Sequence, residues 1–137
     1  MGFIERDYIL RLVRELAEVL ARAMKLKAAK KDDEAAEAIE SGCATLFGID
    51  WKALAWSDSA SAAQLLKEPV RIRAYATLLE HRAQLHAGSG EAAEARSKYQ
   101  HAHEMYCEAG KDPEAMAGAK RTQALIDVAL LPEKYRS

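Results

Sequence analysis

Apolar residues near the start of the chain recur every three or four positions. This spacing is helical, and it predicts one amphipathic helix from about residue 3 to residue 28. Its apolar arc is wider than contact with a single neighbouring helix requires. The main line consists of Ile4, Tyr8, Leu12, Leu16, Leu20 and Ala23, and the arc is widened by Ile9, Val13 and Val19. We therefore expect this helix to contact more than one partner.

Helix-ending and helix-starting residues divide the rest of the chain. Gly48 ends a second helix, Pro69 suits the first turn of a long one, and Asp112 followed by Pro113 caps and opens the last. A short apolar turn and a short helix capped within Ser57–Ser59 lie in between. The expected long helices cover about 33–47, 69–87, 91–109 and 113–131. No stretch has the alternation of a strand, so the sequence predicts an all-α fold.

The sequence resembles itself when it is shifted by 60 residues. Small residues fall on small ones and bulky residues on bulky ones, which indicates a helical hairpin that occurs twice. Two antiparallel helices need small side chains where their backbones approach, and Ala83 and Ala95 would supply them. Tyr99 would fill the adjacent space. The matched pairs are Ala23 with Ala83, Ala35 with Ala95, Ile39 with Tyr99 and Gly42 with Ala102.

The second copy resembles the tetratricopeptide repeat family. The residues that carry the resemblance are Ala83, Gly90, Ala95, Tyr99 and Ala102. Where the family has Trp, Leu and Tyr, this chain has Leu79, Arg82 and His86 in the second copy, and Val19, Arg22 and Leu26 in the first. The family period is ~34 residues, so an offset of 60 implies an insertion of about 26. The layout is similar to small bacterial tetratricopeptide-like proteins of unassigned function.

The resemblance implies a single all-α domain over residues 1–137. It would contain two tetratricopeptide-like hairpins, at about 3–47 and 69–109, with a helical insertion at about 49–68 and a capping helix at about 113–131. Two repeats are fewer than the roughly three that such stacks need. The surplus apolar surface of the first helix therefore predicts coverage by the insertion and by a second copy of the chain, as a homodimer.

Composition narrows the choice of partners. Twenty basic residues balance 21 acidic ones, so no long-range field attracts nucleic acid or an anionic membrane. Charges at Glu5, Arg6 and Asp7 argue against a signal peptide, and no apolar run approaches the roughly 18 residues of a membrane span. Cys43 and Cys107 are too few for a disulfide framework. We expect a cytoplasmic protein that binds neither nucleic acid nor membrane.

No set of residues predicts catalysis, a metal or a cofactor. His103 and Cys107 share a helix face, but zinc needs three or four ligands and the sequence shows no others nearby. We expect His101 to face solvent. The motif of a nucleophile elbow is missing, and the glycines of Gly88–Gly90 lack the following Lys of a phosphate loop. The sequence therefore favours a protein that is not an enzyme.

The family resemblance implies binding of a protein or peptide. In that fold the first helix of each hairpin lines the concave side, so its outward residues are the candidate binding residues. These are Met24, Lys27, Thr77, Glu80 and Gln84. The alternative is a regulator that responds to a small molecule or metal, with a pocket near Trp51 and Trp56. Two tryptophans in a connecting segment more often cover the end of a core, and we expect that here.

Overall fold

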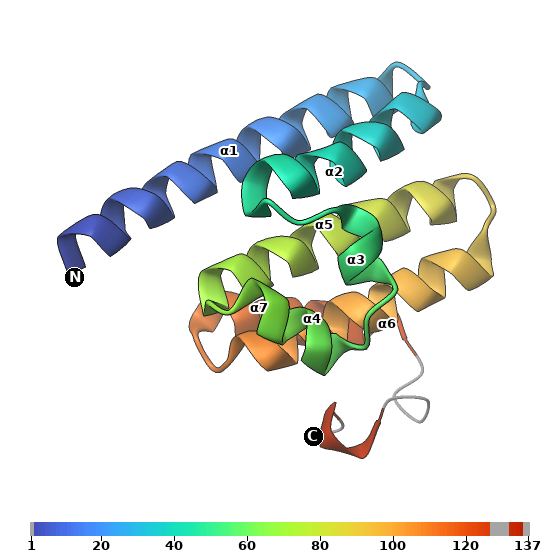
Figure 1. The fold of residues 1–137 in the computed structure, drawn as a ribbon. Helices are drawn as coiled ribbons and strands as arrows, with labels where there is room; N and C mark the ends of the chain where they lie inside the picture. The colour runs from blue at the N-terminus through green and yellow to red at the C-terminus, as the bar shows by residue number, and fades with distance from the viewer. Residues whose placement is uncertain (1, 127–131, 136–137) are drawn as a thin grey trace.

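The described part of the chain folds into seven α-helices in a computed structural model (Figure 1). The structure describes residues 2–126 and 132–135, with side chains for 6–126, 132, 134 and 135. The helices are α1 (Gly2–Ala28), α2 (Asp32–Phe47), α3 (Trp51–Ala55), α4 (Ser59–Leu66), α5 (Pro69–Gly88), α6 (Ala92–Ala109) and α7 (Pro113–Gln123), and a 3-10 turn covers Glu133–Tyr135. These residues contain no strand, which confirms the predicted all-α class.

The helix ends follow local signals in the sequence. Asp58 accepts a hydrogen bond from the Ser61 amide at 2.8 Å, and Asp112 does the same for the Ala115 amide at 2.9 Å. Gly48, directly after α2, has a φ of 69°. This left-handed backbone conformation favours glycine, which commonly ends helices in this way. The last helix ends at Gln123 rather than near 131, and residues 127–131 of that prediction lie outside the described part.

The helices form two antiparallel pairs, α1 with α2 and α5 with α6, and α7 packs against α6 (Figure 1). Helices α1 and α5 run side by side in the same direction, because residues 7–14 lie beside 68–73 and residues 23–28 lie beside 81–85. The N-terminal end of α1 projects past the point where α2 ends. Helix α4 packs against α6, where the Ser59 hydroxyl donates to Glu104 at 2.5 Å.

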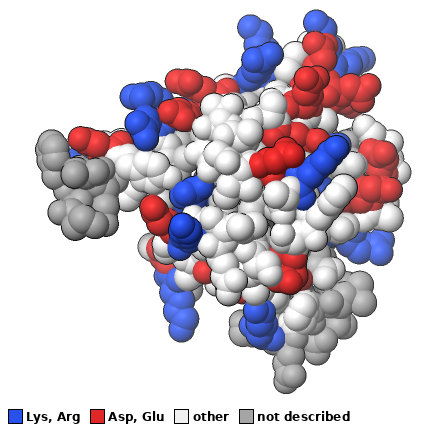
Figure 2. Space-filling view, in the orientation of Figure 1, with Lys and Arg blue, Asp and Glu red and all other residues white. Residues whose placement is uncertain are grey.

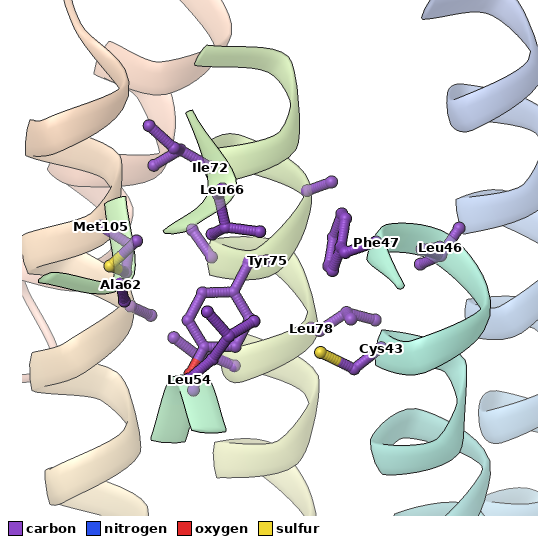
Figure 3. Close-up of a cluster of buried hydrophobic side chains, with 14 of the residues drawn as sticks. Cys43, Leu46, Phe47, Leu54, Ala62, Leu66, Ile72, Tyr75, Leu78 and Met105 are labelled. Atoms are coloured by element: carbon purple, nitrogen blue, oxygen red, sulfur yellow. The ribbon is translucent and has the colours of Figure 1, made fainter. Parts of the chain in front are cut away.

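Tyr75 of α5 lies at the centre of the core (Figure 3). Its ring meets Trp51 of α3 edge-on, with centroids 5.7 Å apart, and His101 of α6 at 5.5 Å. Leu54 and Leu66, from the connecting segment, are fully buried in the same cluster. Residues 49–68 therefore contribute to the core between the two helix pairs rather than only connecting them.

Helices α2 and α5 are also joined by polar contacts. The Arg71 guanidinium donates to the Phe47 carbonyl at 2.6 Å, which satisfies an acceptor left free at the end of α2. Arg82 donates to the Glu40 carboxylate at 2.9 Å. This ion pair gives a structural reason for arginine at position 82.

Two expectations about aromatic and histidine side chains are wrong. Trp51 is buried as expected, but Trp56 is 83% exposed, because it follows the five-residue helix α3 where the chain turns out toward Asp58. His101 does not face solvent, since its ring packs against Tyr75. Burial, together with the smaller effect of the nearby Lys98 charge, lowers the pKa of His101 to about 4.

The small residues of the internal repeat are buried. Ala83 and Ala95 are 0% and 5% exposed, and a side chain at Gly42 would place its Cβ within 2.7 Å of Val19. We therefore expect Ala95→Leu to overpack this region and to lower the free energy of unfolding by about 1–3 kcal/mol. Ala92→Leu, at an exposed position one turn earlier, is the control. Equal melting temperatures for the two variants would contradict the assigned role of Ala95.

Candidate binding surface

A hollow of about 340 Å³ lies between the C-terminal halves of α1 and α5. It brings together three of the five predicted binding residues, Met24, Lys27 and Gln84. Its wall also includes Ile39, His81 and Leu85. Burial lowers the pKa of His81, so its ring is uncharged near neutral pH. The hollow combines apolar walls with a cation and an amide at its edge.

The exposed side of α1 carries an apolar stripe beside this hollow. Leu10 and Met24 are each 57% exposed and Val13 is 48% exposed. Ala17 and Ala21 are exposed between them, and the spacing of three and four residues puts all five on one side of the helix. We call Leu10, Val13, Ala17, Ala21 and Met24 the α1 stripe. Apolar periodicity revealed the breadth of the arc in the sequence, but not which part would remain uncovered.

An open groove continues along the other end of α1 and α5. Its wall includes Tyr8, Ile9 and Leu10 of α1, and Val70 and Arg73 of α5. The sequence provided no signal for this groove, because its two sides are far apart in the chain. The α1 stripe is therefore flanked by hollows at both ends of the α1–α5 contact.

The other two predicted binding residues lie elsewhere. Glu80 was expected to be an exposed groove residue, and this is wrong, because its side chain is 6% exposed beneath α7. Arg121 of α7 donates to its two carboxylate oxygens at 2.8 and 2.6 Å, and the Tyr106 hydroxyl donates to it as well. Thr77 is half-buried, and its hydroxyl donates to the Arg73 carbonyl at 3.1 Å and lies 3.0 Å from the Tyr106 hydroxyl.

These contacts give Glu80 and Thr77 a structural role. Glu80 attaches α7 to α5 through Arg121, and Thr77 links α5 to α6 through Tyr106. Gly118 of α7 leaves the space that the Tyr106 ring occupies. Burial raises the pKa of the Tyr106 hydroxyl far above its usual range, so it stays protonated and donates. The predicted stripe along α5 is therefore interrupted by α7, and Gln84 is the part of it that remains exposed.

His103 and Cys107 form a hydrogen-bonded pair. The His103 Nδ1 lies 2.9 Å from the Ala119 carbonyl, which can only accept, so this nitrogen carries the proton. The Nε2 is then free to accept from the Cys107 thiol at 3.7 Å. Burial raises the pKa of Cys107, which keeps it a thiol. Among the residues described, no three His, Cys, Asp or Glu side chains are grouped to hold a metal ion.

A hollow of about 410 Å³ lies beside the insertion, between residues 55–59 and residues 93–104 of α6, but neither tryptophan lines it. Trp51 is enclosed by the core, and Trp56 points away from it. Neither residue lines the hollow or the groove beside the α1 stripe.

No family model matches this chain. Curated proteins and solved structures gave no match either. The tetratricopeptide resemblance therefore stays a prediction from the residues that carry it. The helices of the described part include none that is long and apolar enough to cross a membrane. Basic and acidic side chains are interspersed over the face shown in Figure 2, without a large area of one sign.

Proposed function

We propose that this protein is a non-catalytic, tetratricopeptide-like module that binds a polypeptide across the surface formed by α1 and α5. The observation that supports this most is the α1 stripe, which exposes large apolar side chains beside a hollow that contains Met24, Lys27 and Gln84. In the proposed arrangement, α1 and α5 are the first helices of the two hairpins. Their parallel, side-by-side course matches that role.

The chemistry of this surface suits a polypeptide. Apolar side chains spaced by three and four residues along a helix can pack against the side chains of a second helix. Met24 has a flexible side chain that adapts to different apolar partners. Lys27 and Gln84 offer a charge and hydrogen bonds at the edge, which contribute to specificity more than to affinity.

Site-specific photocrosslinking tests the proposal. A photoreactive amino acid in place of Met24 is expected to form crosslinks to a polypeptide in native lysate, whether another protein or another copy of this chain. The same amino acid in place of Ala44, which is exposed on α2, is the matched control. If Met24 and Ala44 give the same yield of crosslinked protein, α1 and α5 do not form the binding surface.

A further inference from the structure

Four charged residues follow one edge of the α1 stripe with alternating sign. They are Asp7, Arg14, Glu18 and Lys25, and all four are exposed. At 100° per residue they fall within an arc of about 40°, next to the stripe, whose own residues span about 80°. None of the four makes an ion pair with another residue in the described part of the chain. This edge therefore has charges that are available to a partner.

The charges are arranged symmetrically about Leu16. Asp7 and Lys25 lie nine residues to either side of it, and Arg14 and Glu18 lie two residues to either side. In each pair the two charges have opposite sign. Consider a second, identical helix that runs antiparallel to α1 and is related to it by a two-fold axis perpendicular to α1 at this position. Each charge on the edge of one helix would then lie opposite a charge of the other sign on the second helix. An isologous contact of this kind requires that one surface be complementary to itself.

We propose, as a refinement of the proposed function, that the partner of the α1 stripe is a second copy of this chain, bound with its α1 antiparallel. The two-fold axis passes near Leu16 and Ala17. Asp7 then pairs with Lys25 of the second copy, and Arg14 with Glu18 of the second copy, and each pair occurs twice. In two antiparallel helices related by such an axis, the charged edge of one helix faces the same charged edge of the other, as this pairing requires.

The apolar residues fit the same arrangement. Ala17, near the axis, is small enough to let the two helices approach closely. Because the helices are antiparallel, the end of the stripe that carries Leu10 in one copy lies beside the end that carries Met24 in the other copy. Exposed ion pairs contribute little to affinity, so the apolar contact supplies most of the binding free energy. The charges determine the direction and register of the two helices.

Complementary charge reversal, followed by sedimentation velocity, tests this proposal. The unmodified protein is expected to be in a monomer–dimer equilibrium at micromolar concentration. Arg14→Glu alone, and Glu18→Arg alone, each place like charges opposite one another twice per dimer. Each variant is expected to raise the dissociation constant of its own dimer roughly tenfold to hundredfold. Glu37→Lys, an exposed reversal on α2, should leave the dissociation constant unchanged.

The mixture of the two variants is the decisive sample. When Arg14→Glu and Glu18→Arg proteins are combined, both inter-chain contacts become complementary again, and a heterodimer with about the original affinity is expected. This recovery also shows that both variants are folded. A strictly monomeric protein, or a dimer that neither reversal weakens, would overturn the proposal. Crosslinks from Met24 to an unrelated polypeptide would then still support binding by α1 and α5, so the two ideas fail separately.

Discussion

Replacement of Arg121 by methionine is expected to lower the free energy of unfolding by about 3 kcal/mol. The Glu80 side chain is 6% exposed, and the guanidinium provides two of the three hydrogen bonds that its carboxylate accepts. Removal of one partner leaves a buried charge that is not compensated, which costs ~3–5 kcal/mol. Arg121 itself is 54% exposed, so water replaces part of the contact, and the lower end of that range applies.

Chemical denaturation measures this effect as a change in the midpoint at constant slope. Lys120→Met, at the exposed neighbouring position of α7, is the control and should change stability by no more than about 0.5 kcal/mol. The double variant Glu80→Gln/Arg121→Met carries no buried charge and should recover most of the lost stability. If Arg121→Met and Lys120→Met behave alike, the Glu80–Arg121 pair does not hold α7 in place.

Acid should destabilise the protein through His101. Burial lowers the pKa of this residue from 6.5 to about 4 in the folded protein. Between these values the unfolded chain binds a proton that the folded protein does not. The stabilising contribution is therefore complete above pH 6.5 and is lost as the pH falls to about 4. The whole change amounts to about 3 kcal/mol.

His101→Phe isolates this contribution, because it keeps an aromatic ring against Tyr75 and removes the titrating group. The unfolding free energy of each protein is measured from pH 7 to pH 4. Carboxylates contribute equally to the pH dependence of both proteins. The difference between the two curves of unfolding free energy therefore measures the contribution of His101. The unmodified protein should lose about 3 kcal/mol more than the variant over this range. Parallel curves would show that the imidazole is accessible to solvent in the folded protein.

The positions of the helices could be predicted because the signals that begin and end them act within one turn. Asp58, Asp112, Pro69 and Pro113 stand at helix starts, and Gly48 follows a helix end, as expected from local geometry. The repeat of small residues also predicted burial at Ala83 and Ala95. That inference needs only two neighbouring helices joined by a short turn.

The environment of the polar and aromatic residues depended on contacts between distant parts of the chain. Glu80 has the spacing of an exposed residue along α5, yet α7 returns over it with Arg121. His101 is covered by Tyr75, and Trp56 is left outside while Trp51 is buried. Helical periodicity predicts on which side of its own helix a residue lies. It does not predict which other helix or side chain packs over that side.

The α1 stripe illustrates, within one helix, both what the sequence predicts and what depends on tertiary contacts. The sequence by itself determined that the apolar arc of α1 is too wide for one neighbour, because periodicity of side chains is a local property. Only the tertiary structure decided that the covered part faces α2 and α5 and that Leu10, Val13 and Met24 remain exposed. The reason is physical: which part of an arc is buried depends on the lengths and positions of the helices packed against it, and these are fixed by the fold as a whole.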